Sequence, residues 1–513
     1  QASHPEVTVA VVNTKTIYDA YPFKDVRVPK DGPASVAPSE SRYPSESIWK
    51  WLHAYYQDHP KLQYLLLGGA WLDVTDPETH YLQDGTEITL KNAIPSMRVN
   101  PRKDTMNPTD MYYACLEDGS DDAVHHWDAN NNGVYIEADG NEEKKCNMRP
   151  NISVSRITAK PMPMEESVVM NPKFERAEGN RIFNQHQLIT NFLWKVKVAE
   201  QKDFKGNHKL AITSSSLNYK TLYLSDPLMQ RTENEFFDGA PNMYAPEHVE
   251  TFRDAGPSMR RHASELTALY RPVLETVSYH EPGTYSKNAT KETFASVFNS
   301  FDRELGTVNG HGWAGGSGWF SAKTFSTCTG LTKINVVGVS CETGYLDLYG
   351  NQNGKSVVNL CLGESGQANA TATGGILASV NNTRLGWSTM NGRTYRASGV
   401  SASLHYYMYL GVSQGMNAGD AWQFMCHSYY RDCGNKSPGS TGGQCYTQEM
   451  LFGDPLIRLE PLADSTWDGA SAWRGVYDNA TFTTEASASL AVPEAAGAMS
   501  ITIAQPADAT FAL

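Results

Sequence analysis

Residues 45–69 constrain the fold of this chain most strongly, because two different periodicities follow one another there. Apolar side chains within residues 48–55 recur at the spacing of one helical face, which predicts a helix over residues 45–59. Residues 63–69 then form a short, continuous apolar run that ends in two glycines, which is typical of a strand buried on both faces of a parallel sheet. A strand is also predicted at residues 6–12, and the order strand, helix, buried strand indicates the α/β class.

Two later apolar segments end in residues that can carry chemistry. His311 lies between two glycines at the end of the first segment, and Cys341 closes a second, more strongly strand-like segment, residues 334–341. A cysteine nucleophile needs a base or an acid close by, and two neighbouring strand ends can supply both groups. The same residues also fit a buried or disulfide-bonded cysteine and an ordinary Gly-His-Gly turn, so this pattern alone leaves both interpretations open.

Composition excludes several classes of partner. The chain has 513 residues and a net charge of −13, and it contains no basic run that would bind nucleic acid or an anionic membrane. No apolar stretch is long enough to span a bilayer. The length predicts roughly two to four domains of about 100–200 residues each. The sequence starts at Gln1 with no apolar leader segment, from which we expect a processed, secreted form.

The eight cysteines favour an oxidising compartment. Cys426, Cys433 and Cys445 lie close together in a loop-rich region, which predicts local disulfides. Cys115 and Cys146 bracket an acidic loop and are placed to staple it. There is no CxxC pair and no Cys/His grouping at zinc spacing, which argues against a structural zinc. If Cys341 stays free as a nucleophile, at least one further thiol is unpaired.

The acidic loop itself has the spacing of a calcium site. Hard cations prefer oxygen ligands, and a glycine between the ligands permits the sharp turn that such a loop needs. The alternative is an Asn/Gly-rich hairpin turn with incidental acidic residues, and a calcium-binding carbohydrate module is a more distant interpretation. The predicted calcium ligands are the side chains of Asp128, Asn130, Asn132 and Asp139 and the backbone carbonyl of Val134. We expect this ion to be structural, and we expect no organic cofactor.

Several segments together resemble one family, in the right order along residues 5–460. The chain resembles the gingipain-type cysteine peptidases, which share a caspase-like α/β fold with legumain, clostripain and caspases. Each match is weak alone, and their order gives the resemblance its strength. The matching segments are Tyr64–Gly69, the acidic loop WDANNNGVY, Ser153–Ile157, Asn309–Gly312, Val339–Cys341, Gly375–Ser379 and Phe452–Pro455.

The resemblance implies a fold and a domain organisation. It implies a caspase-like three-layer sandwich, with a mainly parallel sheet in two subdomains, followed by a short β-rich C-terminal tail. We expect an N-terminal α/β subdomain with the calcium loop at residues 1–175 and a caspase-like catalytic subdomain at 176–460. The Ala, Ser, Thr and Pro-rich residues 461–513 are expected to form the β-like tail.

The resemblance also implies a secreted cysteine endopeptidase that acts on proteins or peptides. Cys341 would be the nucleophile and His311 its partner, because a nearby imidazole raises the thiolate population and can protonate the leaving amine. The backbone N–H groups of Gly312 and Cys341 would form the oxyanion hole. The family normally has a strand and a helix before the strand predicted at residues 6–12, so the chain's own cleaved N-terminal segment is a further expected partner.

The resemblance also predicts a specificity pocket, and each of its three predicted residues has an alternative interpretation. Asp226 lies where the acid that selects a basic P1 residue is expected, and Trp387 and Met390 suit the lining of the pocket. Asp226 is equally compatible with a turn before Pro227, and the other two with ordinary packing. The family often orients its histidine with an acid after the strand at 209–213, where this chain has Ser214–Ser216. The second hypothesis is therefore a catalytically weak or inactive module with a structural or adhesive role in an extracellular assembly.

Overall fold

A computed structural model of the chain provides the structure. It describes residues 7–24, 41–69, 80–81, 87–88, 93–102, 105–117, 127–128, 132–136, 146–157, 162–163, 192–197, 199, 210–215, 249–251, 303–310, 312–313, 316–317, 320–321, 331–337, 340–345, 375–387, 400–413, 416–432 and 441–458.

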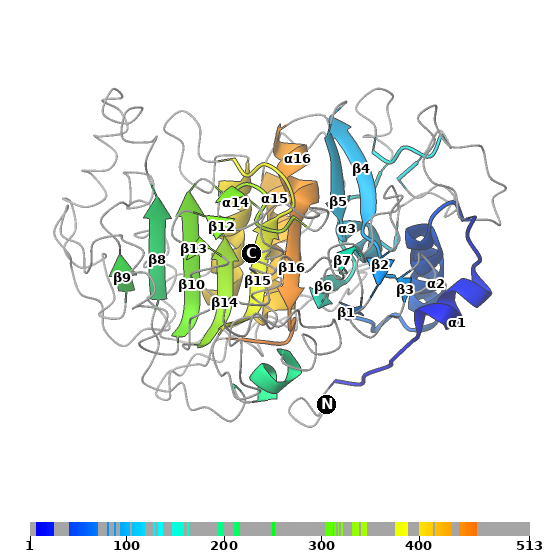
Figure 1. Cartoon of the computed structure of the whole chain (residues 1–513), viewed down its shortest axis with the longest axis horizontal. Helices are drawn as coiled ribbons and strands as arrows, with labels where there is room; N and C mark the ends of the chain where they lie inside the picture. Colours follow the sequence, from blue (N-terminus) through cyan, green and yellow to red (C-terminus); the bar gives the residue numbers. More distant parts are fainter. Residues whose placement is uncertain are drawn as a thin grey trace, which may run out of the picture.

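An eight-stranded sheet forms the centre of the molecule (Figure 1). All neighbouring strands run parallel except one pair, which contains the last strand of the described residues and the strand beside it. This confirms the predicted α/β class with a mainly parallel sheet. In spatial order the strands are β1 (Tyr64–Gly68), β6 (Ser153–Ile157), β16 (Glu449–Gly453), β15 (Gly375–Asn382), β14 (Leu331–Val337), β10 (Arg303–Gly310), β8 (Leu210–Ser215) and β9 (Val249–Thr251).

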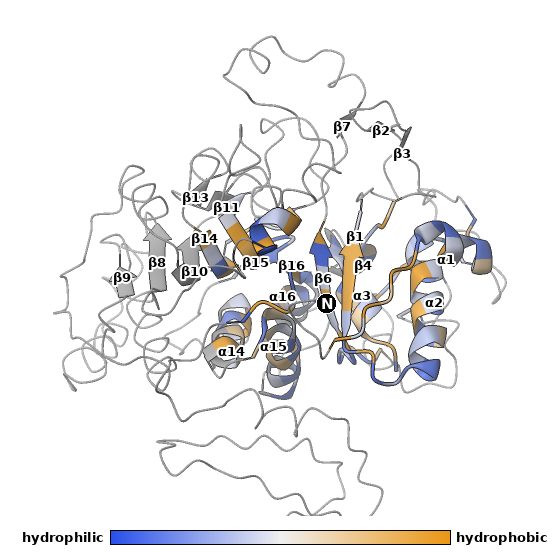
Figure 2. Cartoon of the chain, turned by 90° about the horizontal axis from the view of Figure 1, so that it is seen from below, coloured by the Kyte–Doolittle hydropathy of each residue, from blue (hydrophilic) through white to orange (hydrophobic). Residues whose placement is uncertain are grey.

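Helices cover the central strands and the N-terminal end of the molecule. Figure 2 shows two long helices, α14 and α15, together on one face of the sheet, and α1 and α2 at the end occupied by the N-terminal part of the chain. α15 packs against both β6 and β16. The helices are α1 (Thr14–Ala20), α2 (Pro44–Asp58), α3 (Met111–Ala114), α14 (Ser401–Ser413), α15 (Ala418–Asp432) and α16 (Thr441–Gln448).

Short strands form three smaller sheets in addition to the main one. One of them follows β10 directly and lies beside the candidate active site. The hairpin β4 (Met97–Arg102)–β5 (Thr105–Thr109) is the first, and β3 (Glu87–Ile88), β2 (His80–Tyr81) and β7 (Met162–Pro163) form the second. The third consists of β11 (Gly312–Trp313), β12 (Gly316–Ser317) and β13 (Phe320–Ser321).

β16 joins the two halves of the sheet, although it follows all the other described strands in sequence. It pairs parallel with β6 and antiparallel with β15, and all residues of these three strands are buried. Gly453 ends β16 with φ +97°, and a Cβ at this position would lie 2.0 Å from the carbonyl oxygen of Leu377. Only glycine fits this close crossing of two strands. The sheet therefore runs without a break through strands of both predicted subdomains.

The structure corrects the prediction for the first residues of the chain. Residues 7–12 form no strand, and Val9 and Val11 are exposed. Asn13 instead starts a helix, because its side chain accepts a hydrogen bond from the N–H of Lys15 at 2.7 Å and so caps α1. Alternating valines favour a strand, but a strand also needs a partner edge.

The predictions for the next elements are partly confirmed. α2 matches the helix expected over residues 45–59, with Pro44 in its first turn. β1 is confirmed as a strand but not as one buried on both faces, because it forms the edge of the sheet and Leu66 is 45% exposed. β8 was expected to break at Ser214 and instead continues to Ser215. Two further helices, α14 and α15, precede the last described strand.

Candidate active site

Cys341 lies in a tight turn beyond the carboxyl end of β14. The following residue, Glu342, has φ +58°, a left-handed conformation that is unfavourable for residues with a Cβ. The Glu342 N–H donates to the carbonyl of Arg384 at 2.7 Å, and the Gly344 N–H donates to the carbonyl of Asn382 at 2.8 Å. These hydrogen bonds tie the turn to the chain that leaves β15, and they hold the strained backbone in place.

Gly312 lies directly against Cys341. A Cβ on Gly312 would lie 2.6 Å from the carbonyl oxygen and 2.8 Å from the amide nitrogen of Cys341. The Gly312 N–H also hydrogen-bonds to the Cys341 sulfur. β10 and β14 are parallel neighbours, so the residues beyond their carboxyl ends meet at one edge of the sheet. The structure therefore brings together the two segments that the sequence singled out, while His311 lies outside the described residues.

The thiol of Cys341 is half-buried, and its surroundings favour the neutral form. Burial, above all, raises the pKa of the Cys341 thiol, and the negative charge of Glu342 raises it further. Backbone hydrogen bonds, first that of Gly386 and then that of Gly312, act in the opposite direction and lower this pKa. A thiol in this position needs a base to become a nucleophile near neutral pH.

One of the three predicted pocket residues, Trp387, directly follows a residue that contacts the thiol. The Cys341 sulfur lies 3.7 Å from the carbonyl oxygen of Gly386, the residue that precedes Trp387. Within the described part of the chain, the indole N–H of Trp387 is buried without a hydrogen-bond partner. Asp226 and Met390 lie outside the described residues, so their positions stay predictions.

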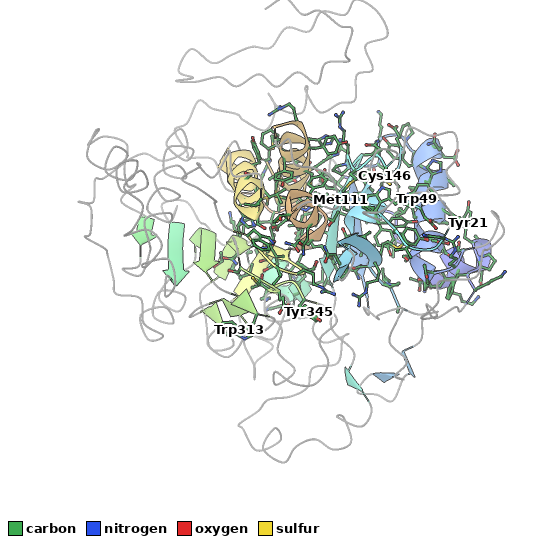
Figure 3. The ribbon with its side chains drawn as sticks, turned by 90° about the horizontal axis from the view of Figure 1, so that it is seen from above. Tyr21, Trp49, Met111, Cys146, Trp313 and Tyr345 are labelled. Atoms are coloured by element: carbon green, nitrogen blue, oxygen red, sulfur yellow. The ribbon has the colours of Figure 1, made fainter. Side chains whose placement is uncertain are left out.

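Two aromatic residues next to the site were not singled out from the sequence. Trp313 follows Gly312 and is 39% exposed, and Tyr345 follows the Cys341 turn. The Arg384 guanidinium lies over the Tyr345 ring, 4.4 Å from its centroid. Figure 3 places Trp313 and Tyr345 at the same end of the molecule. The only sequence signal for these residues was their position next to the His311 and Cys341 segments.

The strand beside the histidine segment carries serines at its end. The parallel register pairs Ser215 of β8 with Gly310, and Ser214 with Asn309. An acid that orients the histidine would be expected from this strand end, and the described residues of β8 contain no Asp or Glu. Ser216 lies outside the described residues.

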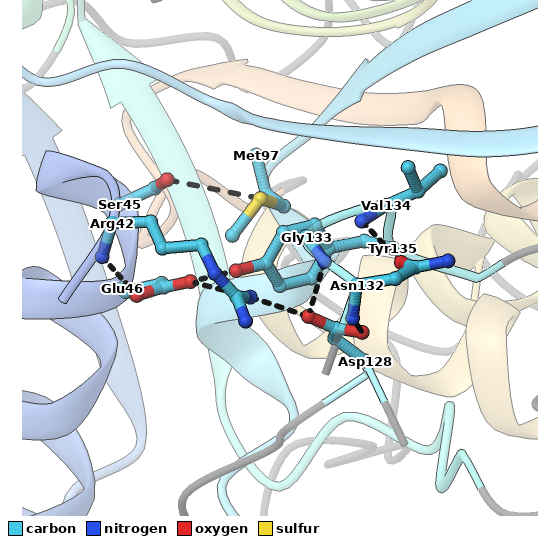
Figure 4. Close-up of polar contacts among 9 residues, drawn as sticks. All are labelled: Arg42, Ser45, Glu46, Met97, Asp128, Asn132, Gly133, Val134 and Tyr135. Carbon is cyan, nitrogen blue, oxygen red and sulfur yellow. Dashed lines mark hydrogen bonds and ion pairs between the residues drawn. The ribbon is translucent and has the colours of Figure 1, made fainter. Parts of the chain in front are cut away.

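The predicted calcium loop folds around Asp128, which is almost completely buried (Figure 4). Its carboxylate accepts hydrogen bonds from the N–H of Asn132 at 3.0 Å and from the N–H of Gly133 at 2.9 Å. Gly133 has φ +83°, which explains the need for glycine at the turn. The Asn132 side chain accepts from the N–H of Val134 at 2.8 Å. These contacts give the described part of the loop the tight turn that the sequence predicted.

A cation already neutralises the Asp128 carboxylate. Arg42, which precedes α2, donates from Nη1 to Asp128 Oδ2 at 2.5 Å, and both side chains are buried. Among the described residues, no three His, Cys, Asp or Glu side chains gather into a metal-ligand set. Asn130 and Asp139 lie outside the described part, so calcium binding stays a prediction. A calcium ion could use Asp128 only after displacing the guanidinium.

The expected disulfides are absent among the cysteines that the structure describes. The staple across the acidic loop and a link between Cys426 and Cys445 were wrong predictions, because none of the four buried cysteines Cys115, Cys146, Cys426 and Cys445 forms a disulfide. Buried thiols behave as small apolar side chains in a core. Burial raises the pKa of Cys445 to about 12 and that of Cys115 and Cys426 well above the ordinary value. Cys433 lies outside the described residues.

The fold places a half-buried cysteine, with Gly312 against its backbone, at the carboxyl edge of a mainly parallel α/β sheet. Residues 1–460 match the sequence model of peptidase family C25, and the chain belongs to this family. Membership of this family implies the activity of a cysteine peptidase.

Known proteins of similar structure are distant. One is the crystal structure of gingipain R (RgpB), described as an Arg-specific cysteine proteinase, with 12% identity and a TM-score of 0.41, covering 82% of this chain and 69% of that chain. Another is the complex of Porphyromonas gingivalis RgpB pro- and mature domains, with 13% identity and a TM-score of 0.39, covering 82% and 70%. No match was found among curated protein sequences. The family assignment rests on the sequence model.

Proposed function

We propose that the protein is an endopeptidase in which Cys341 is the nucleophile and His311 its acid–base partner. The observation that carries this proposal is the contact of Gly312 with the backbone and sulfur of Cys341. This contact supports a histidine next to the thiol, because His311 directly precedes Gly312 in the chain. The strained Glu342 supports the same proposal, because unfavourable backbone conformations cluster at active sites.

The chemistry follows from these groups. His311 accepts the thiol proton, and the Cys341 sulfur attacks the carbonyl carbon of the substrate. The N–H groups of Gly312 and Cys341 donate to the oxyanion that forms. The C–N bond breaks, the amine leaves with the proton of the imidazolium, and a thioester remains on Cys341. Water then attacks the thioester while His311 takes its proton, which releases the acid and restores the thiol.

The predicted pocket residues support cleavage after a basic P1 residue. Trp387 adjoins the carbonyl that faces the Cys341 sulfur, which supports a position beside the P1 side chain of a substrate. Asp226 would supply the charge complementary to Arg or Lys. Gingipain R is described as Arg-specific, which agrees with this proposal for a relative of the same family.

The inactive structural module is the second candidate, and one observation favours it. The register places Ser215 beside Gly310, in the position where an orienting acid would support the histidine. A Cys–His pair without a third group accounts for the same observation. The two candidates differ in turnover, which decides between them.

Secretion and a structural calcium ion complete the proposal. Gingipain-family proteins are extracellular peptidases, which supports secretion and a cleaved N-terminal segment as a partner. No helix in the described part of the chain is long and apolar enough to cross a membrane. The tight turn around Asp128 supports calcium at this loop, in competition with Arg42.

Turnover of short peptides tests the proposed activity. Fluorogenic peptides with Arg, Lys, Ala or Asp at P1 are offered to the wild type, Cys341→Ala, His311→Ala and Cys445→Ala in calcium buffer. We expect cleavage after Arg or Lys that is lost in the first two variants and kept in Cys445→Ala. Equal background rates in the wild type and Cys341→Ala would establish the structural-module alternative instead.

A further inference from the structure

The turn that carries Cys341 is held from both sides by one residue, Asn382, at the end of β15. Its side-chain Nδ2 donates to the carbonyl of Ser340, the residue before Cys341, at 3.1 Å. Its backbone carbonyl accepts the N–H of Gly344, beyond Cys341, at 2.8 Å. Asn382 and Ser340 are completely buried. A single residue of the neighbouring strand therefore fixes the backbone on either side of the nucleophile.

The orientation of the Asn382 amide is set by two further donors. Ser401 Oγ and Gln448 Nε2 each donate to Asn382 Oδ1 at 3.1 Å. Because Oδ1 accepts from both, Nδ2 has to face Ser340, and the opposite amide orientation would set donor against donor. Ser401 begins α14 and Gln448 ends α16, so two helices hold the side chain.

The same hydrogen-bond network reaches the predicted pocket. Ser401 Oγ also accepts the N–H of Trp387 at 3.3 Å, and Gln448 Nε2 also donates to the carbonyl of Leu385 at 2.6 Å. Asn382 thus lies between the turn of the nucleophile and the segment that carries Trp387. The Asn382 amide is hydrogen-bonded through both Nδ2 and Oδ1, and a buried polar group held in this way rigidifies its surroundings.

We propose that Asn382 is the positioning residue of the active site, which clamps Ser340 and Gly344 and so fixes the Cys341 sulfur relative to the amides of the oxyanion hole. This inference rests on the proposed function, because it assigns Asn382 a role in the same reaction. Asn382 does not touch the substrate or the reacting atoms. Its contribution is geometric, and small displacements of reacting groups are costly in rate.

Asn381 provides a matched control on the same strand. It is also an asparagine and is completely buried, but neighbouring residues of a strand point to opposite faces. Its Nδ2 donates to Ser379 Oγ at 2.9 Å, and its amide forms no hydrogen bond with the described residues of the Cys341 turn. A Cβ added at Gly344 would lie 3.1 Å from the Cβ of Asn381, and Asn381→Ala keeps that Cβ. Asn382→Ala and Asn381→Ala remove the same atoms from equally buried positions, so they separate positioning from general destabilisation.

The test compares kcat, KM and the unfolding midpoint of these two full-length variants with those of the wild type. Asn382→Ala is expected to lower kcat about 100-fold with little change in KM, as a misplaced nucleophile would. Asn381→Ala is expected to lower the unfolding midpoint similarly and to keep kcat. If Asn382→Ala does not fold, Ser401→Ala serves instead, with a kcat loss of up to about 10-fold, the effect of one hydrogen bond. Equal kcat losses in the Asn382 and Asn381 variants, or a kcat kept in the tested variant, overturn the proposal.

A readout without substrate separates this inference from the proposed function. The rate at which iodoacetamide alkylates Cys341, followed by peptide mass spectrometry over a range of pH, reports the environment of the sulfur whether or not the protein is a peptidase. If the wild type cleaves no peptide, the proposed function fails, and the alkylation profile alone decides. A shifted profile in Asn382→Ala and an unchanged one in Asn381→Ala support the clamp, and identical profiles in both variants overturn it.

Discussion

Gly312 shows how one missing side chain shapes the site. The backbone of Cys341 occupies the space that a Cβ would need, and the Gly312 N–H faces the sulfur. The glycines around His311 could be recognised from the sequence as places of close backbone approach. The sequence did not show that Cys341 is the residue that approaches Gly312. The Cys341 turn is held by the contact of Glu342 with Arg384, and this contact depends on tertiary structure. Residue types were therefore predictable here, and their geometry was not.

Substitution of Gly312 tests this close approach. Gly312→Ala is expected to lower kcat/KM by about 100-fold or more, because the added methyl displaces the Cys341 backbone and one oxyanion donor. Gly68→Ala is the matched control, since a Cβ at Gly68 meets nothing within 4 Å. Peptide cleavage by the two variants and the wild type is the measurement. Equal activity of both variants would show that Gly312 does not need to lie against the nucleophile.

The start of α2 and the acidic loop form one buried unit. Arg42 links them by its ion pair with Asp128, and Glu46 in the first turn of the helix accepts from the N–H of Arg42 at 2.6 Å and from the hydroxyl of Tyr135. The helix was predicted correctly because its periodicity is local. The sequence analysis did not identify Arg42 as the partner of Asp128, because the two residues are 86 positions apart in the sequence. Local patterns cannot show such a pairing.

Calcium and Arg42 are predicted to compete for Asp128. Arg42→Gln leaves a buried carboxylate unpaired and is expected to cost about 3–5 kcal/mol of unfolding free energy. Calcium is then expected to raise the unfolding temperature of Arg42→Gln more than that of the wild type. The control is Lys15→Gln, which breaks an exposed ion pair with Asp19 and is expected to cost less than about 1 kcal/mol. Thermal unfolding of each protein with calcium or with a chelator measures the stability loss and the calcium effect. If calcium changes the unfolding temperature of none of the proteins, the predicted calcium site is wrong.

Glu46 predicts a pH dependence of stability. Burial, against the opposing effect of Arg42, raises the pKa of Glu46 from 4.5 to about 7. The folded state thus holds the proton more tightly, and the contribution of Glu46 to stability is complete below 4.5 and is lost as the pH rises to about 7. The loss amounts to roughly 3 kcal/mol. Urea unfolding across this interval should show a shallower decline for Glu46→Gln, and identical slopes in both proteins would contradict the assignment.

The central sheet connects the whole molecule, and β16, the last strand of the described residues, lies in the middle of it. β16 enters between β6 and β15 and connects the N-terminal strands to those that carry the active site. The α/β class was predictable, because short apolar runs and helical periodicities alternate along the chain. The strand order was not, since nothing in residues 449–453 shows that they separate strands far apart in the sequence. The prediction that β1 is buried on both faces was wrong for the same reason, because its apolar sequence does not show that it forms the edge of the sheet.

Selective labelling of Cys341 tests the central claim most directly. A thiol-directed affinity probe with a basic P1 residue is added to the intact protein in calcium buffer, and the modified peptide is identified by mass spectrometry. Of the cysteines that the structure describes, Cys341 alone is partly exposed and the other four are buried, and burial raises the pKa of Cys115, Cys426 and Cys445. The account predicts stoichiometric modification at Cys341 that is lost in His311→Ala. An unmodified Cys341, or modification that does not depend on His311, would contradict it.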